Sequence, residues 1–525
     1  LGFLSAILLA RTLGTVGSGA DAFALANQLP NNIYALIAGG VLTAVLVPQI
    51  VKASAGADGG AGYINKIVTL GFVIFLALTA LATLLAPVLV LLYAQESGDA
   101  GRGFSDADIA LATALAYWCL PQVLFYALYS LFGEVLNARS VFGPFTWAPV
   151  LNNVVVITGL LIFGQLFSQK DPADALEWTP GMTALLGGGA TAGIALQALI
   201  LLVFWKRAGI RYRPDFAWRG VGLAHTGKAA GWLFGMILVA QVAGVVQANV
   251  ATLATSDGEA GLAILRFSWL LFMVPHSVIT VSLATAYFTR MSNHASAGEM
   301  DSVREDLSNS TRRVGLMMVI ASAGLIVLSV PFAKLFGGQP DEVWSMAQVI
   351  AAYSVGLVAF SVVFVVQRVY YALGDTRTPF FFQLAHAAVF ISLAVVVSGF
   401  DTAIIAPSLA LAASIASWVQ LVVALALLRK KLGGLRLIPL LGSLALFVLV
   451  VAVASIPGVW IVLGWGGVDP AGFVLGHSLG ALVTLVVGAA VMTVIYLGGL
   501  LVLRNQDAKV IVSGAVGLIR RVFTR

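Results

Sequence analysis

Charged residues are scarce in this sequence. Only 10% of its 525 residues are Asp, Glu, Lys or Arg, whereas soluble domains carry about 25%, and 60% of the residues are hydrophobic. Because so few charges would not keep a chain of this length dispersed in water, we infer that lipid is its solvent. The single cysteine, Cys119, excludes a disulfide framework within the chain.

Motifs of known catalytic chemistry are also missing. The sequence has no HExxH, Walker A or paired CxxC pattern. One pattern, "GHSLG" at 476–480, matches the serine elbow of lipases, but that motif requires a strand-turn-helix corner. Here it opens an apolar run, where small residues favour helix packing. We therefore expect no enzyme, with no catalytic residue, metal site or cofactor.

Apolar runs fill most of the chain. A helix needs about 20 apolar residues to cross the hydrocarbon of a bilayer. The runs and their breakers predict an all-α integral membrane protein with about fourteen transmembrane helices. These are expected near residues 1–14, 22–51, 67–94, 110–136, 145–166, 182–205, 229–254, 260–289, 314–336, 343–373, 379–400, 403–428, 437–463 and 475–503. The first run is short, and we expect its helix to begin before Leu1.

Positive charge gathers in alternate connections. Most of the 29 lysines and arginines lie in one set of connections, which includes 206–228 and the tail from Arg504, while the opposite set, such as "AQESGDAGRGFSDAD", is acidic. Because positive loops stay in the cytoplasm, we expect both termini there. The segment 206–228 is predicted to be an amphipathic connector. The tail is predicted either to lie along the anionic inner leaflet or to be an ordinary basic stop.

The two halves of the chain are alike. "EVLNARSVFGPF" at 134–145 matches "RVYYALGDTRTPFF" at 368–381, and "LTAVLVPQIVKASAG" at 42–56 is similar to "LATAYFTRMSNHASAG" at 283–298. Transporters are often built from such repeats, with the substrate path between them; shared membrane composition is the alternative. The predicted domains are an N-lobe at 1–205, the connector at 206–228, a C-lobe at 229–430, a helix pair at 431–503 and a basic cytoplasmic tail at 504–525.

The stretch "RVYYALGDTRTPFF" also predicts a turn. Gly374 favours a left-handed helix end, and Thr378 with Pro379 favours the start of the next helix. Asp375 and Arg377 are then expected in a tight cytoplasmic turn.

Arg368 precedes that turn, about one and a half turns inside the membrane edge. It is either a snorkelling or loop-pairing arginine or one that faces a pore. Its equivalent in the first half is Glu134, so we expect a Glu134–Arg368 pair to act as a cytoplasmic gate.

Other polar residues interrupt the apolar runs. Arg266 is expected about two turns from the outer edge, where an arginine is costly and usually faces a cavity, although it is also able to snorkel outward. Its guanidinium suits a phosphate. Asp21 and Arg11 occupy a helix start and a helix end, which their charges favour. A set of mid-helix amides predicts either a hydrated path or interhelical hydrogen bonds: Asn27, Gln28, Asn31, Asn32, Asn152, Asn153, Gln241, Gln247 and Asn249.

Four stretches together resemble the MurJ/MviN lipid II flippases: "DAFALANQLPNNIYALIAGGVLTAVLVPQIVKA", "GPFTWAPVLNNVVVI", "LFMVPHSVITVSLATAYFTRMS" and "RVYYALGDTRTP". The resemblance implies two six-helix lobes in a V around a central cavity, with the pair at 431–503 forming a groove for a lipid tail. It implies a protein of the bacterial cytoplasmic (inner) membrane that moves lipid II, undecaprenyl-pyrophosphate carrying a disaccharide-pentapeptide, from the inner to the outer leaflet for peptidoglycan synthesis. Membrane potential or a coupling ion would supply the bias. The partners implied are lipid II and membrane lipids, with no nucleic acid.

The chain departs from the family pattern at several places. Tyr34 and Ala35 stand where relatives usually carry basic residues, Ser5 and Ala6 replace an early Arg-Asp pair, and Arg266 lies about one turn further from Pro275. The expected central cavity is thus reduced to Arg11, Asp21, Asn31 and Arg266. The gate or structural turn comprises Glu134, Arg368, Asp375 and Arg377. Some relatives continue into a cytoplasmic regulatory domain, and the basic end near Arg525 resembles such a junction.

Two other functions stay open at this point. A polysaccharide-lipid flippase or a multidrug/cation antiporter of the same superfamily is the nearest alternative, although an antiporter would favour intramembrane acids over arginines. A membrane-embedded glycosyltransferase would need a catalytic carboxylate on a large outer loop, and the outer loops here are short apart from "ESGDAGRGFSDAD".

Overall fold

The computed structural model describes residues 1–38, 50, 53, 60–97, 101–141, 143–207, 212–217, 227–255, 258–435 and 437–523. Most of these residues are helical, and among them the one β-type pairing is an isolated bridge between Glu96 and Phe104. Twelve helices or interrupted helices of this part are long and apolar enough to cross a membrane, and each corresponds to a predicted one. The chain is therefore an all-α, multi-pass membrane protein.

The two remaining predicted helices, at 1–14 and 22–51, correspond to a short apolar helix, Gly2–Leu13, and to the helix Ser18–Ala38. Residues 39–49 lie outside the described part, so the count of fourteen stays a prediction.

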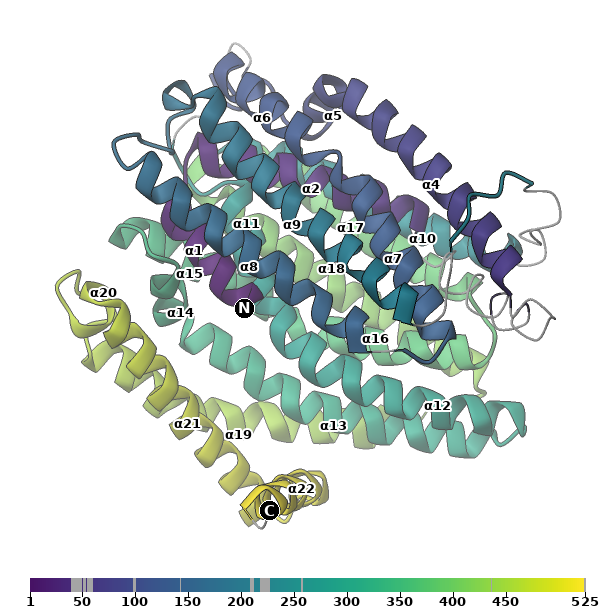
Figure 1. The fold of residues 1–525 in the computed structure, drawn as a ribbon. Coiled ribbons are helices and arrows are strands. Elements are labelled where there is room, and N and C mark those ends of the chain that lie inside the picture. Colours follow the sequence, from purple (N-terminus) through teal and green to yellow (C-terminus); the bar gives the residue numbers. More distant parts are fainter. Residues whose placement is uncertain are drawn as a thin grey trace. The chain divides into compact units, whose positions relative to one another are not determined.

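The chain forms two compact units, Leu1–Ala263 and Ile264–Arg525, here called unit 1 and unit 2. Unit 1 contains α1 (Gly2–Leu13), α2 (Ser18–Ala38), α4 (Ala61–Leu84), α5 (Ala86–Tyr93), α6 (Asp106–Cys119), α7 (Gln122–Ala138), α8 (Gly143–Leu166), the 3-10 turn η2 (Ala175–Glu177), α9 (Pro180–Arg207) and α10 (Gly227–Thr252) (Figure 1).

Unit 2 starts within the first turn of α11. Its elements are α11 (Leu262–Pro275), the π-helical segment η5 (His276–Val281), α12 (Ser282–Ser296), α13 (Met300–Val327), α14 (Ser329–Phe336), α15 (Pro340–Ser354), α16 (Leu357–Ala372), α17 (Arg377–Val397), α18 (Thr402–Lys431), α19 (Leu437–Gly464), α20 (Phe473–Gly476), α21 (Ser478–Val502) and α22 (Gln506–Phe523). Helix α10 packs in unit 1 against α2 and α5, whereas the repeat predicts a C-lobe from 229. The lobe boundaries stay a prediction, because a repeat and a compact unit are different properties.

Both units break their helices at matching places. In unit 1 the α4–α5 junction is Leu85, shortly before Pro87, and in unit 2 the α13–α14 junction is Leu328, before Pro331. Proline lacks an N–H and clashes with the preceding turn, so each apolar run becomes two helices.

A second break in each unit is stabilised by a neighbouring helix. At the α6–α7 junction the carbonyl of Trp118 accepts a hydrogen bond from Thr191 of α9 at 2.6 Å. At the α15–α16 junction the carbonyl of Tyr353 accepts from Ser414 of α18 at 3.0 Å, and that of Val355 from the indole of Trp418 at 3.0 Å. Carbonyls freed by a break are tolerated in a membrane when a neighbour satisfies them.

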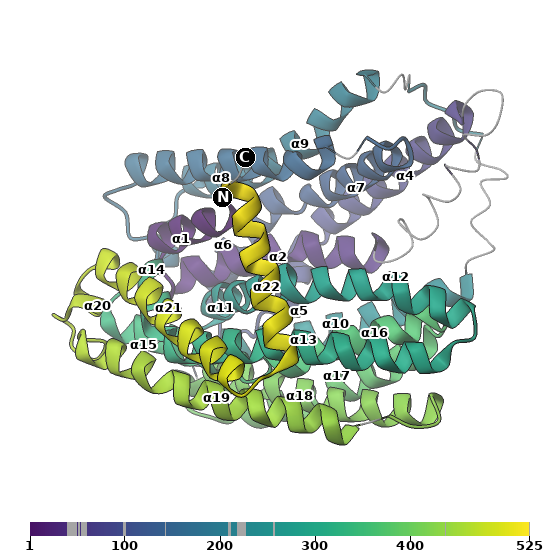
Figure 2. The same cartoon turned by 90° about the horizontal axis from the view of Figure 1, so that it is seen from below.

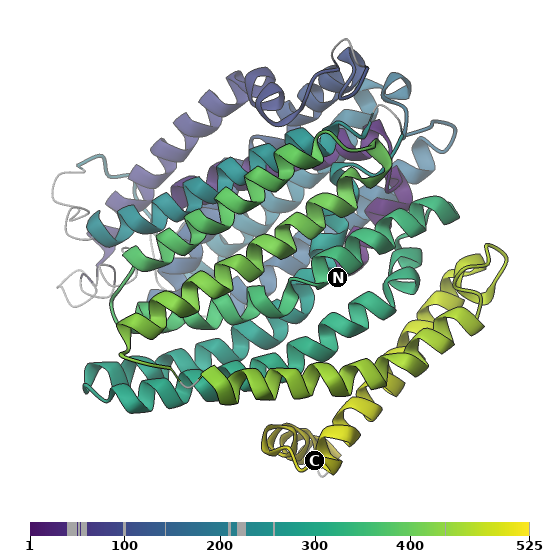
Figure 3. The ribbon, with the colours of Figure 1, turned by 180° about the vertical axis from the view of Figure 1, so that it is seen from behind.

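The order α4 to α9 thus repeats as α13 to α18. Helices α8 and α9 run side by side in unit 1, and α17 and α18 do so in unit 2 (Figures 1 and 3). This repetition supports the duplication predicted from 134–145 and 368–381. The other matching pair includes 42–56, most of which lies outside the described residues.

The described part of the connector, 212–217, is attached to α4. The Tyr212 hydroxyl lies 2.9 Å from Thr69 Oγ1, and the backbone N–H of Arg213 donates to Asn65 at 3.1 Å. The rest of the predicted connector between 208 and 226 falls outside the described residues, so its amphipathic character stays a prediction.

The C-terminal helices complete unit 2. Helices α19 and α21 pack on α13, where the buried Tyr496 hydroxyl donates to the carbonyl of Leu316 at 2.9 Å. Helix α22 leaves the end of α21 at an angle and contacts α13 (Figure 2). The lipid-tail groove expected at 431–503 stays a prediction.

The lipase-like "GHSLG" is a helix start, as predicted. Ser478 is the first residue of α21. A Cβ at Gly480 would lie 1.8 Å from the carbonyl oxygen of Phe473, so this glycine allows α21 to approach the preceding turn. No strand precedes Ser478 among the described residues 437–477, and packing explains the motif.

Candidate functional site

Asp21, in the first turn of α2, is fully buried. Its Oδ2 accepts a hydrogen bond from the Thr255 hydroxyl at 2.6 Å, and its Oδ1 accepts one from the backbone N–H of Ala263 at 2.7 Å. A buried carboxylate is stable only when such donors replace water. Asp21 therefore ties the start of α2 to the segment between α10 and α11, and both of its oxygens are occupied within unit 1.

Gly261 makes this contact sterically feasible. A Cβ at this position would lie 2.1 Å from Asp21 Oδ2, far inside van der Waals contact. Neither Thr255 nor Gly261 stood out in the sequence, because only the folded chain brings these two residues next to Asp21 of α2.

The polar amides of unit 1 mostly join helices. Asn27 accepts from Gln122 Nε2 at 3.2 Å, Asn32 donates to the Tyr93 hydroxyl at 3.2 Å, and Gln241 Nε2 donates to the backbone carbonyl of Asn32 at 2.7 Å. These contacts agree with the interhelical alternative. Asn31 differs, since it lies on α2 beside Asn32 but is exposed.

Tyr34 lies at a position where the resemblance to the family led us to expect a basic residue. It stacks on Tyr126 of α7, with ring centroids 5.7 Å apart and planes at 30°, and it hydrogen-bonds with Ser130. An aromatic contact between α2 and α7 thus takes the place of a charge. No periodic signal in the sequence predicted it.

The two predicted cavity arginines lie in different units. Arg11 is exposed in the last turn of α1, as a cation at a helix C-terminus should be. Arg266 is half-buried on α11. Their grouping with Asp21 and Asn31 in one cavity stays a prediction.

The two residues of the predicted gate also lie in different units. Glu134 is buried on α7 and accepts a hydrogen bond from Asn137 at 3.4 Å. Arg368 lies on α16 in unit 2, where its guanidinium stacks over aromatic rings. The gate therefore stays a prediction.

The turn after α16 was predicted correctly at Gly374 and wrongly at Thr378. Gly374 has a φ of 71°, and the backbone N–H groups of Gly374 and Asp375 return to the carbonyls of Tyr371 and Tyr370, which is a Schellman end. Helix α17 begins at Arg377, and its N-cap residue, Thr376, makes no side-chain capping bond, so Asp375 supplies the cap. Its Oδ1 accepts from the backbone N–H groups of Arg377 at 3.0 Å and Thr378 at 2.9 Å. Thr378 lies inside the helix because the tight Schellman turn places Asp375 over the first free N–H groups.

Asp375 also carries an ion pair. Lys431, the last residue of α18, lies with Nζ 2.5 Å from Asp375 Oδ2. Burial opposes ionisation of this carboxyl, but the hydrogen bonds from Lys431 and Thr378 outweigh it and lower its pKa to about 2. Arg377 is exposed and stacks on Phe381 at 5.6 Å. The turn thus fastens α17 to α18.

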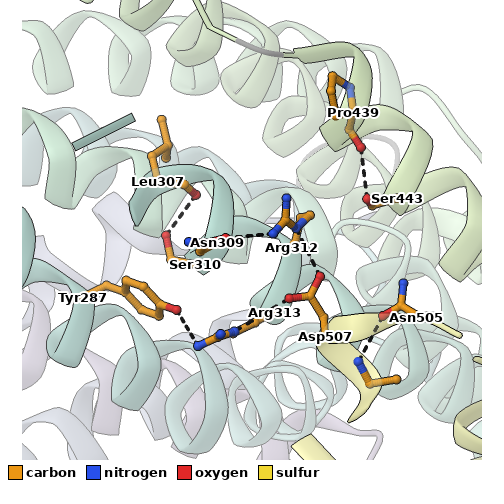
Figure 4. Close-up of polar contacts among 11 residues, drawn as sticks. Tyr287, Leu307, Asn309, Ser310, Arg312, Arg313, Pro439, Ser443, Asn505 and Asp507 are labelled. Atoms are coloured by element: carbon orange, nitrogen blue, oxygen red, sulfur yellow. Dashed lines mark hydrogen bonds and ion pairs between the residues drawn. The ribbon is translucent and has the colours of Figure 1, made fainter. Parts of the chain in front are cut away.

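A charged cluster in unit 2 was not predicted. Asp507, in the first turn of α22, accepts a hydrogen bond from Arg312 Nε at 3.1 Å, and Arg313 Nε lies 3.8 Å from its other oxygen. Arg313 also donates to the Tyr287 hydroxyl at 2.6 Å (Figure 4). The sequence showed only an "RR" pair and a tail aspartate far away in the chain.

The described residues contain no group of three His, Cys, Asp or Glu side chains that could hold a metal ion. What the sites offer instead are cations and amides on apolar helices. Such groups can bind and orient a polar ligand.

Comparison with known proteins decides the family. A family model described as "Lipid II flippase MurJ" matches residues 9–467. The chain belongs to the MurJ family. Two curated relatives, each called a probable lipid II flippase MurJ, are 26% identical. That of Haemophilus influenzae matches over 72% of this chain and 74% of its own length, and that of Rhizobium meliloti over 88% and 84%.

Solved structures agree at the level of the fold. "Lipid II flippase MurJ, inward closed conformation" has a TM-score of 0.71 at 18% identity, covering 96% of this chain and 97% of that one. A multidrug resistance transporter of the MATE family, within the MOP superfamily, has a TM-score of 0.62 at 12% identity, covering 82% and 94%. The four sequence stretches predicted the MurJ fold, and this structural similarity confirms it.

Proposed function

We propose that this chain moves lipid II from the inner to the outer leaflet of the cytoplasmic membrane by alternating access, without chemical change to the substrate. The observation that carries the proposal is membership of the MurJ family over residues 9–467. The repeated helix order of the two units supports it, because transporters with such repeats alternate around a site between them.

The charges suit the substrate class. A pyrophosphate headgroup crossing apolar helices needs cationic donors, and arginine matches phosphate oxygens with a planar fork. Arg11 and Arg266 are the proposed contacts of the central cavity, with Asn31 as an exposed amide. The polyprenyl tail stays in hydrocarbon, for which α19 and α21 are proposed as the groove.

Asp21 is proposed to stabilise one conformation of the transporter without contacting the substrate. Both of its oxygens are bound to Thr255 and Ala263, so a state that separates α2 from the α10–α11 segment must break two buried hydrogen bonds. Such a contact holds one conformation and is released in another.

Glu134 and Arg368 are proposed to form a gate on the cytoplasmic side. The test exchanges the charges. Glu134→Arg and Arg368→Glu should each reduce translocation, and the double variant should recover it. A double variant no better than either single one would remove the gate from the proposal.

A second candidate is a multidrug/cation antiporter, which the fold similarity to the MATE transporter favours. Antiporters need an intramembrane carboxylate free to bind a cation. The hydrogen bonds to both oxygens of Asp21 weigh against that role for this residue. Export of a fluorescent cationic drug, with no effect on lipid II, would support the antiporter.

The orientation and energy source belong to the same proposal. The positive-inside pattern places both termini in the cytoplasm, so the basic tail 504–525 would face anionic lipid and any cytoplasmic regulatory partner. Membrane potential or a coupling ion is proposed as the driving force, on the family resemblance alone.

The deciding experiment measures lipid II on the outer leaflet of cells depleted of this protein, using an externally added lipid II-modifying enzyme or label. Externally accessible lipid II should fall while total lipid II does not. Expression of the wild-type chain should restore it. Unchanged external lipid II in fully depleted cells would contradict the proposed function.

A further inference from the structure

We propose that Arg368 is an anion-binding residue that takes a phosphate of the pyrophosphate headgroup at the end of α16. This inference rests on the proposed function and adds to it a binding residue outside the expected central cavity. This role and the gate are alternatives for Arg368, and translocation restored by the double charge exchange would argue against the binding role.

Three aromatic rings hold the Arg368 guanidinium. Its Cζ lies 4.5 Å from the ring centroid of Phe364, 5.8 Å from that of Phe288 and 5.9 Å from that of Tyr371. Phe364 and Tyr371 lie on α16 itself, whereas Phe288 comes from α12, which packs against α16. The side chain is thus held by two helices of unit 2 and does not extend freely toward water.

The three rings around Arg368, here called the aromatic box, are Phe288, Phe364 and Tyr371, and Phe364 is held by a further contact. Phe364 also packs edge-to-face against His276, with ring centroids 5.3 Å apart, and His276 Nδ1 lies 3.0 Å from the hydroxyl of Ser361. His276 belongs to the π-helical segment η5, and such segments often occur at functional sites. The ring over which Arg368 lies is therefore fixed in place.

No carboxylate neutralises Arg368 among the described residues. The buried acids Asp306 and Asp507 are paired with Arg290 and Arg312, and the half-buried Asp375 is paired with Lys431. Arg368 Nε is buried and has no hydrogen-bond partner. Arg313, whose Nε is likewise buried and unbonded, uses its guanidinium to donate to the Tyr287 hydroxyl, whereas in the described part of the chain the Arg368 guanidinium contacts only aromatic rings and keeps its donors for a ligand.

The geometry selects an oxyanion. Aromatic faces stabilise a cation from above and below its plane, but they accept few of the N–H bonds that lie within the plane. A guanidinium surrounded by aromatic rings thus keeps N–H donors for a partner with two oxygens at the right spacing, which phosphate provides. Lysine, with a point charge and no plane, would not serve equally.

Simple snorkelling explains less. A snorkelling arginine places its head in water, where every N–H is hydrated. Here the side chain is half-buried near the end of α16, and its Nε is shielded by the rings. This end of α16 is the one that the positive-inside pattern assigns to the cytoplasm, where a lipid-linked substrate would enter.

The test measures binding of undecaprenyl pyrophosphate to the purified full-length chain in nanodiscs. Undecaprenol and inorganic pyrophosphate serve as further probes. Arg368→Gln should weaken binding of undecaprenyl pyrophosphate at least tenfold and leave undecaprenol unaffected. Arg368→Lys should fall between Arg368→Gln and wild type. The matched control is Arg429→Gln, which removes an exposed arginine from the last turn of α18 and should bind like wild type.

Each outcome decides something. Equal affinity of wild type and Arg368→Gln would overturn the inference while leaving the proposed function intact. A wild-type chain that neither binds undecaprenyl pyrophosphate nor moves lipid II would contradict the proposed function itself. If inorganic pyrophosphate binds in an Arg368-dependent way and the lipid does not bind, the site takes the free anion. That result would overturn the proposal that Arg368 binds a lipid headgroup. If Arg368→Gln fails to fold, Phe364→Leu provides a second test, because it removes a ring of the aromatic box and keeps the charge of Arg368. Unchanged affinity of Phe364→Leu for undecaprenyl pyrophosphate would contradict the proposed role of the aromatic box.

Discussion

Ser140 in unit 1 and Gly374 in unit 2 share a left-handed backbone, with φ angles of 59° and 71°, at the ends of α7 and α16. The same pair of backbone hydrogen bonds closes both ends: Ser140 to Asn137 and Val141 to Leu136 in unit 1, and their counterparts in unit 2. The spacing between Ser140 and Gly374 equals that between Val135 and Val369 in the sequence match. The two units therefore repeat down to the geometry of one turn.

This pair predicts opposite effects of two substitutions. Gly374→Ala introduces no clash, because no atom lies within 4 Å of the added Cβ, but a left-handed alanine costs about 1 kcal/mol. Ser140→Gly removes that strain, and the variant should be at least as stable as wild type. Thermal unfolding of the purified proteins in detergent measures both. Equal stability of Gly374→Ala and wild type would contradict the left-handed cap.

Asp375 predicts a dependence on pH. Its pKa is lowered from 3.8 to about 2, so its ionised form stabilises the fold above pH 4, and this contribution is lost as the pH falls toward 2. At pH 7 Asp375→Ala should cost about 1–2 kcal/mol, the usual value of a helix cap. Asp375→Asn keeps the cap oxygen and should cost less, since its partner Lys431 is partly exposed.

Unfolding measured from pH 7 down to pH 3 tests this assignment. The difference between wild type and Asp375→Asn should shrink over the acidic part of that range. Lys431→Met should resemble Asp375→Asn at pH 7. A difference that persists unchanged at low pH would show that the charge of Asp375 is not its source.

Gly261 predicts a large effect from one methyl group. Gly261→Ala would place a Cβ 2.1 Å from Asp21 Oδ2 and displace the carboxylate from Thr255 and Ala263. Overpacking together with unpaired buried donors should lower the free energy of unfolding by about 2–3 kcal/mol. Gly231→Ala, in α10 with no atom near its Cβ, is the control and should be neutral or stabilising by up to about 1 kcal/mol. Similar values for both variants would argue against the Asp21 contact.

Asp507 predicts how α22 is held. Asp507→Asn removes the charge between Arg312 and Arg313 but keeps the volume, and charge-assisted hydrogen bonds of this kind contribute about 1.5–3 kcal/mol. Amide hydrogen exchange in residues 508–514 should therefore accelerate by about tenfold or more. Asp301→Asn, which alters an almost fully exposed carboxylate of α13, is the control. Unchanged exchange in Asp507→Asn would mean that apolar packing alone, around the buried Ala508, holds the helix.

Arg266 is tested through transport. Arg266→Ala should reduce lipid II translocation by at least tenfold, because a phosphate contact of arginine is stronger than an ordinary hydrogen bond, and Arg266→Lys should recover part of it. Thermal unfolding is measured in parallel to separate binding from folding. Translocation at the wild-type rate would remove Arg266 from the proposed site.

The sequence was sufficient for the membrane architecture because its signals are local. Run length predicts a spanning helix, and Gly374 acts on the backbone next to it. The breaks at Leu85 and Leu328 were missed, because the runs 67–94 and 314–336 were each predicted as one helix. The twelve spans and the turn at Gly374 were predicted for this reason. The choice between Thr378 and Asp375 as the cap was wrong by only a few residues, since both are good caps and the register of the first turn decides between them.

What the sequence determined by itself is therefore the solvent, the spanning helices and the signs of a repeat. Tertiary structure decided the partners: Thr255 and Gly261 at Asp21, Lys431 at Asp375, and Phe288 at Arg368. These contacts join segments that are distant in the chain, and a hydrogen bond or a stacked ring depends on ångström-scale positions that no run of hydrophobicity encodes. The physical reason is range: burial and backbone preference act along the chain, whereas the fate of a buried charge depends on whatever the fold brings beside it.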